Sequence, residues 1–133
     1  MGETIYLIAL DVEALHVFIM NKTGAAPSPL RDRRLLESAL MRPQMAAHYA
    51  SADLVEQCAL LAVAISQSQA FVDGNKRTAF VAADVFLRAN GSLFVGDPLG
   101  MARQLEAVAT HTGGEKEGTA FFVQWLRRQV EWS

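Results

Sequence analysis

Hydrophobic side chains recur every three to four residues along most of the chain, a spacing that predicts amphipathic helices. Capping residues or prolines precede several of these stretches, and glycines separate others. Strand signals are minor, with short extended segments at 4–9 and 93–95. The pattern predicts an all-α fold, a compact single domain over residues 1–133 with about six helices and at most short strands. The expected helices span residues 11–21, 33–41, 51–68, 75–89, 98–109 and 119–132.

Single residues set several of these boundaries. Asp11 and Ser51 are the expected N-caps of the first and third helices. Pro43 is expected to stop the second helix or to start the next turn, which places His48 and Tyr49 in a connection. In the first helix, the helical spacing predicts a buried face made of Val12, Leu15, Phe18 and Ile19.

Three reactive or charged residues inside the apolar helices are interpreted as structural. Cys58 is the only cysteine, so no intramolecular disulfide can form, and its apolar surroundings favour a buried inert thiol. His16 is expected to be a structural histidine of the first helix. Asp84 is expected to pair with Arg88, which lies one helical turn further on.

Composition narrows the class of protein. A chain of 133 residues fits one domain, and a hydrophobic content of 51% argues against disorder. A formal net charge of −2 gives no global case for nucleic acid or an anionic membrane, so neither partner is expected. We see no secretory signal and no apolar stretch long enough to span a bilayer, and the unpaired cysteine favours a reducing compartment. These features predict a cytoplasmic protein.

The most polar stretch lies between two apolar helices and reads Gln-Ala-Phe-Val-Asp-Gly-Asn-Lys-Arg-Thr-Ala-Phe from Gln69. A helix start binds anions, because its first amides lack intrahelical partners and lie at the positive end of the helix dipole. Gly74 permits close backbone approach and Asn75 can cap the helix. Lys76 and Arg77 add positive charge. The stretch therefore predicts a phosphate site.

Asp73 is the natural metal ligand of this site, because magnesium carried by a nucleotide is held by one or two carboxylates together with phosphate oxygens. The same residues also suit an ordinary turn whose basic side chains are solvated. The flanking segments favour the phosphate site, since a very polar turn here joins two helices that should be buried.

Several separated motifs resemble the Fic/Doc family, and in particular its death-on-curing, or Doc-like, toxin branch. The resemblance covers nearly the whole chain, with the motifs in the family's order. Its strongest part is the run from Phe71 through Asp73 to Thr78. The other matching segments are Tyr6-Leu7, Leu30-Arg31-Asp32-Arg33, Leu35-Leu36-Glu37-Ser38-Ala39-Leu40 and Phe86-Leu87-Arg88-Ala89-Asn90-Gly91.

The resemblance implies phosphoryl transfer from a nucleoside triphosphate such as ATP to a protein serine or threonine. Members that transfer adenylyl groups carry glycine at the position of Lys76 and arginine at that of Phe80. The Doc-like branch binds the nucleotide in the opposite orientation and acts as a kinase. Its implied target is a translation elongation factor, and an antitoxin whose flexible segment folds on the toxin is the implied partner. A Fic-type adenylyltransferase is the alternative enzyme.

Residue roles follow from the same resemblance. Asp73 would bind Mg²⁺, and Gly74 and Asn75 would shape the anion nest. Lys76 and Arg77 would hold phosphate and offset charge that develops in the transition state. Phe71 would fix the loop to the core.

Gln69 departs from the family pattern, which has a histidine there as general base. A glutamine can orient a hydroxyl but cannot accept its proton at neutral pH. Loss of a positioned base costs about 10²- to 10⁴-fold in rate, so the chain is expected to be nearly inactive. An inactivating change and a natural pseudo-enzyme both explain Gln69, and the intact remaining site favours the first.

A module that only binds phosphate or nucleotide is the non-enzymatic alternative. In such a module Asp73 would be unfavourable, because a carboxylate repels phosphate unless a metal ion lies between them.

Overall fold

Helices account for most of the fold in the computed structural model, which describes residues 3–132. A short antiparallel strand pair joins two segments near the carboxyl end, with Ser92 opposite Trp132 and Phe94 opposite Val130. Because helices dominate and the strands of the described residues are this one short pair, the prediction of an all-α fold with at most short strands is confirmed. In chain order the elements are α1 (Ala9–Lys22), α2 (Arg33–Ala50), α3 (Leu54–Ser68), α4 (Asn75–Ala89), β1 (Ser92–Phe94), α5 (Pro98–Thr110), α6 (Glu115–Arg127) and β2 (Val130–Trp132).

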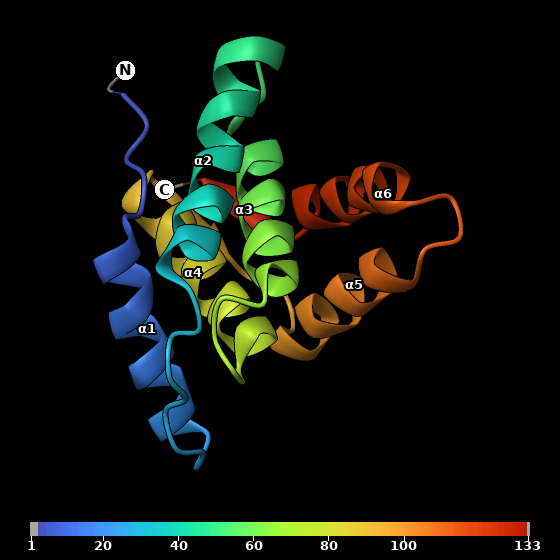
Figure 1. The fold of residues 1–133 in the computed structure, drawn as a ribbon. Coiled ribbons are helices and arrows are strands. Elements are labelled where there is room, and N and C mark those ends of the chain that lie inside the picture. The colour runs from blue at the N-terminus through green and yellow to red at the C-terminus, as the bar shows by residue number, and fades with distance from the viewer. Residues whose placement is uncertain (1–2, 133) are drawn as a thin grey trace.

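The antiparallel helices α3 and α4 form the centre of the domain, with α1 and α2 on one side and α5 and α6 on the other (Figure 1). Small residues such as Ala62 and Ala82, both fully buried, let these two helices approach closely. Cys58 is also fully buried, and burial raises the pKa of its thiol well above the ordinary value. The prediction of an inert buried cysteine is confirmed.

Helix α1 begins earlier than predicted. Asp11 is not the N-cap but lies in the first turn, where its Oδ2 accepts the N–H of Ile8 at 2.9 Å. Val12 is fully buried as expected, whereas Phe18 is 52% exposed, so the prediction for Phe18 was wrong. The face of α1 that meets the core is instead completed by His16 and Met20.

Helix α2 continues through Pro43, contrary to the prediction that this proline would end it. Proline removes one backbone donor, but the buried Pro43 ring packs in the interior and its φ suits a helix. His48 and Tyr49 are therefore helical. The C-cap of α2 is Ser51, which has the left-handed conformation with φ of 52°. The N-cap of α3 is Asp53, so the prediction that Ser51 would cap this helix was wrong.

The final helix ends at Arg127, so the predicted helix over 119–132 is wrong at both ends. The last described residues of the chain instead form β2 and pair with β1. Trp125 packs against the core, with its ring centroid 6.1 Å from that of Phe94 and 6.3 Å from that of Phe122.

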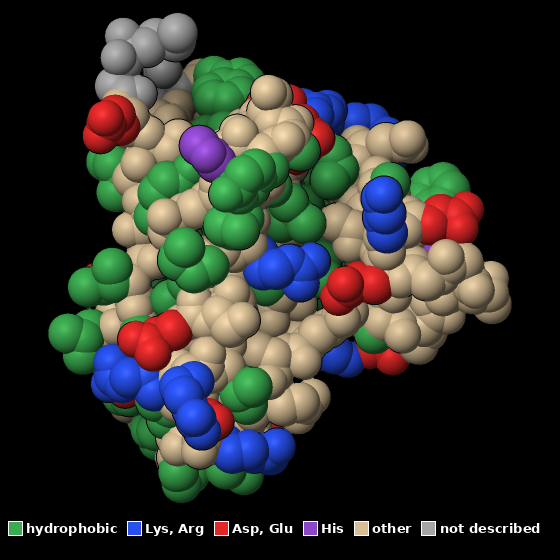
Figure 2. All heavy atoms as spheres, turned by 45° about the horizontal axis from the view of Figure 1, so that its top comes forward, with side chains coloured by type: hydrophobic (Ala, Val, Ile, Leu, Met, Phe, Trp, Pro, Cys, Tyr) green, Lys and Arg blue, Asp and Glu red, His purple; other side chains and the backbone are tan. Residues whose placement is uncertain are grey.

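Acidic side chains accompany many of the basic ones on the surface. Figure 2 shows Lys and Arg side chains next to Asp and Glu side chains on one face of the molecule. Arg33 Nη2 forms an ion pair with Glu13 Oε2 at 2.7 Å. Arg88 Nε pairs with Asp84 Oδ2 at 3.3 Å, as predicted. Within residues 3–132, no helix combines the length and apolar character that crossing a membrane requires.

Candidate functional site

The loop between α3 and α4 carries the polar stretch, and the α1–α2 connection supports it. The N–H of Arg31 donates to the carbonyl of Ala70 at 2.6 Å, and the N–H of Val72 donates to that of Pro29 at 3.2 Å. Leu30 and Phe71 form an isolated antiparallel bridge between these bonds. The two loops are therefore joined as a short sheet-like strip.

Phe71 fixes the loop to the core, as predicted. Its side chain is 2% exposed and stacks on the ring of His16, with centroids 3.9 Å apart and planes 6° from parallel. His16 is itself buried and lies directly beneath the loop. The structural role predicted for His16 is supported by this packing.

Both ring nitrogens of His16 have partners within the protein. Nδ1 lies 2.8 Å from the Thr78 hydroxyl, and Nε2 accepts the N–H of Ser28 at 3.3 Å. This arrangement fits a neutral ring protonated on Nδ1. Burial lowers the pKa of His16, and this effect outweighs the negative charge of Asp73, which raises it. His16 is therefore held within the fold through both ring nitrogens and is not placed to act as a base in this loop.

The backbone at Asp73 is held by the Ser28 hydroxyl, which accepts the Asp73 N–H at 3.0 Å and donates to the Asp73 carbonyl at 2.8 Å. The Asp73 carboxylate accepts the N–H of Gly74 at 2.8 Å. The carboxylate is thus directed by its own turn toward the start of α4.

Gly74, not Asn75, is the N-cap of α4, so the capping role predicted for Asn75 was wrong. Asn75 is the first helical residue, and its amide holds the loop instead. Oδ1 accepts the Phe71 N–H at 3.1 Å, and Nδ2 donates to the Phe71 carbonyl at 2.9 Å. No side chain of the described residues caps α4, so its first-turn amides are left for an anion.

Gly74 meets a conformational requirement and a steric one. Its φ is +82°, in the region where side-chain-bearing residues are strained. A Cβ here would overlap with Met20 Sδ and lie 3.1 Å from Cε1 of His16. Only glycine lets the loop lie this close to α1.

A hollow of about 320 Å³ brings all of the predicted site residues together. We call it the polar hollow. Gln69 lies at its edge as the C-cap of α3, with a left-handed φ of 56°. The lining residues are Ser66, Gln69, Val72, Asp73, Gly74, Asn75, Lys76 and Arg77.

A second space, here called the apolar cavity, adjoins the polar hollow and shares Lys76 and Arg77 with it. It measures about 360 Å³ and lies between α1, α4 and α5. Its other lining residues are Ile19, Thr23, Phe80, Pro98, Leu99 and Ala102. An apolar space beside a cationic one suits a ligand with a flat apolar part and an anionic part.

Both shared cations have partners in the protein. Lys76 Nζ forms an ion pair with the carboxylate of Glu106 on α5. Arg77 Nη1 lies 3.4 Å from the Thr23 hydroxyl and 3.7 Å from Met20 Sδ, which are neutral and weak partners.

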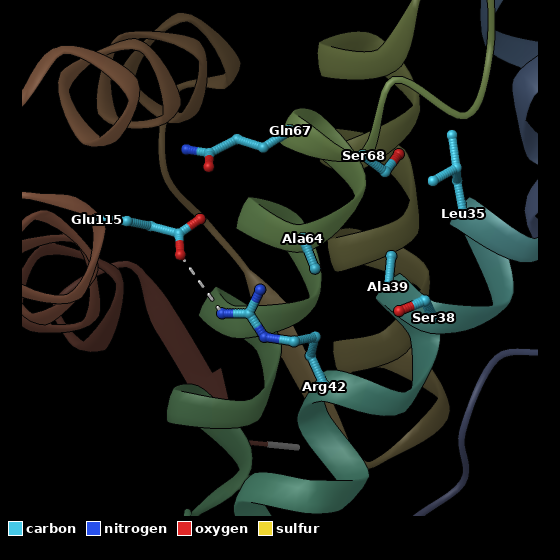
Figure 3. A pocket seen from close by; sticks show the side chains of 8 residues that line it. All are labelled: Leu35, Ser38, Ala39, Arg42, Ala64, Gln67, Ser68 and Glu115. Atoms are coloured by element: carbon cyan, nitrogen blue, oxygen red, sulfur yellow. Dashed lines mark ion pairs between the residues drawn. The ribbon is translucent and has the colours of Figure 1, made fainter.

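A further hollow of about 260 Å³ lies on the other side of α3, between α2, α3 and the start of α6. Figure 3 shows Arg42 extending toward Glu115 across its opening, at a distance of 3.7 Å. Gln67 and Ser68 line it, but Gln69 and the other predicted site residues do not.

The donor set of the polar hollow fits magnesium that arrives with a nucleotide. Asp73 is the single carboxylate among its lining residues, and the described chain holds no group of three metal-binding side chains. One carboxylate with phosphate oxygens and waters can complete the shell of Mg²⁺. The site therefore suits a metal–nucleotide complex better than a resident metal ion.

Three residues that shape this site were not predicted to do so. Ser28 lies in the connection between α1 and α2, Thr78 sits behind the loop, and Glu106 lies on α5. Thr78 belongs to the run that resembles the family signature, but no local sequence signal points to Ser28 or Glu106, because each acts through a contact with a distant segment.

Comparison with known proteins agrees with the geometry. Residues 6–87 match the Fic/DOC family. Over 70 residues the chain is 40% identical to Toxin Doc from Mycolicibacterium smegmatis (strain ATCC 700084 / mc(2)155). The aligned residues make up 51% of this chain and 54% of that protein. The chain thus spans about half the length of the curated relative that it matches. Because the family match takes in more than half of the chain and the whole polar hollow, the chain belongs to the Fic/DOC family.

Proposed function

We propose that the chain is a Doc-like toxin that binds magnesium–ATP and belongs to a lineage that transfers the phosphoryl group to a protein serine or threonine. The observation that carries this proposal is the convergence of Asp73, Lys76, Arg77 and the free first-turn amides of α4 on one hollow. These groups bind and neutralise a polyphosphate, as phosphoryl transfer requires.

The reaction would join the hydroxyl oxygen of a target serine or threonine to the γ-phosphorus of ATP. The bond from that phosphorus to the β,γ-bridging oxygen breaks, ADP leaves, and the hydroxyl proton must pass to a base. Bound magnesium would offset phosphate charge beside Asp73. Lys76 and Arg77 would stabilise the charge on the transferred group.

Gln69 would then limit the rate. Its amide can hold the attacking hydroxyl by a hydrogen bond but cannot take the proton. His16 has both ring nitrogens engaged beneath the loop, so it offers no substitute. We therefore expect binding without efficient turnover, whether Gln69 is an inactivating change or a natural pseudo-enzyme feature.

The apolar cavity supports a kinase over an adenylyltransferase. Phe80 stands where the resemblance places arginine in adenylylating members, and its ring packs edge-on to Phe94 at 5.9 Å. An apolar residue there cannot hold a terminal phosphate but can line the site of a nucleoside base. The base in the apolar cavity would direct the γ-phosphate toward the polar hollow and Gln69.

We propose an elongation factor as target and an antitoxin as partner, following the resemblance. Leu99, at the rim of the apolar cavity, is 63% exposed. An antitoxin segment that folds over this rim would bury apolar surface and exclude the nucleotide at once. Co-purification with a small neighbouring-gene product that releases when ATP binds would support inhibition in trans.

The deciding experiment uses the Gln69→His variant with ATP labelled on either the α- or the γ-phosphate and a bacterial elongation factor as acceptor. The proposal predicts transfer of the γ-label alone, together with growth arrest of the host. Transfer of the α-label would instead establish an adenylyltransferase. A histidine is compatible with the left-handed backbone at Gln69, so the variant should fold.

Metal dependence separates the enzyme lineage from a simple binding module. The proposal predicts ATP binding that requires magnesium and is lost in Asp73→Ala. Binding that is independent of metal, or strengthened when the carboxylate is removed, would favour the module.

A further inference from the structure

The two cations of the polar hollow are restrained unequally. Within residues 3–132, the partners of Arg77 are neutral groups at 3.4 and 3.7 Å, which an anion can displace at little cost. Lys76 is paired with a full negative charge on Glu106, which lies 30 residues further along the chain on α5. Both side chains of this ion pair are about half exposed, at 51% and 55%.

A phosphate that approaches Lys76 therefore meets Glu106. The lysine ammonium has three donors and could contact both anions, but a carboxylate next to a phosphate is electrostatically unfavourable. Lys76 lines the polar hollow and the apolar cavity, so a nucleotide that spans both must pass this ion pair.

We propose that Glu106 lowers the affinity of the site for nucleotides by competing with their phosphates for Lys76. In the nucleotide-free chain the Glu106 carboxylate holds the ammonium toward α5, and a bound triphosphate displaces it. This inference rests on the proposed nucleotide function and adds a residue outside the signature stretch. Glu106 acts through Lys76 and touches no reacting atom, so it is a positioning residue.

The test measures binding of magnesium–ATP by calorimetry to the unaltered chain, whose Gln69 keeps turnover from disturbing the measurement. Glu106→Gln preserves the shape of the side chain and removes its charge. It should bind magnesium–ATP about 1.5- to 5-fold more tightly, the range expected when one exposed ion pair no longer competes. The gain should shrink as salt is raised, because the competing pair is exposed.

Glu117→Gln is the matched control. Glu117 is an exposed carboxylate on α6, 57% accessible, and it lies 3.5 Å from the His111 ring rather than beside Lys76. The control should leave the affinity unchanged. Both variants should melt within a few degrees of the unaltered chain, which shows that any change in affinity is not a folding defect.

A double-mutant cycle separates competition for Lys76 from general repulsion. In a Lys76→Met background, Glu106→Gln should no longer improve binding. An equal improvement with and without Lys76, weaker binding in Glu106→Gln, or no change at all would overturn the role of Glu106 alone. Failure of both the unaltered chain and Glu106→Gln to bind magnesium–ATP would overturn the proposed function as well.

Discussion

The Ser28 hydroxyl binds both backbone groups of Asp73, accepting its N–H at 3.0 Å and donating to its carbonyl at 2.8 Å. These residues lie 45 positions apart in the sequence. The proposed metal ligand is thus positioned by the α1–α2 connection as well as by its own loop. The same connection reaches His16 through the N–H of Ser28, so loop, connection and α1 form one supported unit.

Ser28→Ala should weaken the contacts between the loop, the α1–α2 connection and α1 without removing a side chain from the hydrophobic core. The loss of each such hydrogen bond lowers the free energy of unfolding by about 0.5–1.5 kcal/mol, and by less where water replaces the lost partner. We expect a modest loss of stability and a weaker magnesium dependence of ATP binding. Urea denaturation and calorimetry check both, with Ser38→Ala on the surface of α2 as control. Unchanged magnesium dependence would argue against this support of Asp73.

Gly74→Ala should be strongly destabilising. Left-handed backbone costs a residue with a side chain about 1–2 kcal/mol, and overpacking against Met20 and His16 adds about 1–3 kcal/mol. Gly24→Ala is the control, because Gly24 has a similar φ of +79° with nothing within 4 Å of its Cβ position. Chemical denaturation should show a clearly larger loss for Gly74→Ala. Equal losses would mean that the contact with α1 is unimportant.

Asn75→Asp tests the amide that holds the loop. Aspartate keeps the acceptor for the Phe71 N–H, loses the donor to the Phe71 carbonyl, and adds negative charge beside the proposed phosphate site. Magnesium–ATP binding should weaken by about fivefold or more, since two like charges about 4 Å apart repel by on the order of 1–4 kcal/mol. Asn75→Ala, which removes both bonds without adding charge, should weaken it less. The reverse order would contradict the proposed anion site.

Stability should decrease in mildly acidic solution because of His16. Burial lowers its pKa in the folded chain below the ordinary value of 6.5. The folded state then binds fewer protons than the unfolded state, so this contribution is complete above pH 6.5 and is lost as the pH falls toward the folded pKa. Urea denaturation at several pH values checks this, and His16→Gln should flatten the dependence while the exposed His48→Gln should not. An unchanged profile in His16→Gln would exclude His16 as the cause.

Local sequence predicted those features that depend on neighbouring residues. The bounds of α4 follow from the turn at Gly74 and from Asn90 and Gly91 at its end, and all the site residues between Gln69 and Arg77 fall in one hollow. The prediction that Pro43 would end the second helix was wrong, because tertiary packing keeps α2 continuous across this residue. Contacts such as Thr78 with His16, 62 residues apart, have no local pattern and could not be predicted.

The rate of γ-phosphoryl transfer in Gln69→His, compared with the unaltered chain at saturating magnesium–ATP, tests the central claim most directly. Asp73 to Arg77 should bind the nucleotide in both chains, while only the variant has a base for the hydroxyl proton. We predict a rate increase of about 10²- to 10⁴-fold, abolished again when Asp73→Ala is added. A variant that binds magnesium–ATP as tightly as the unaltered chain yet transfers no faster would contradict the claim that Gln69 is what keeps this site inactive.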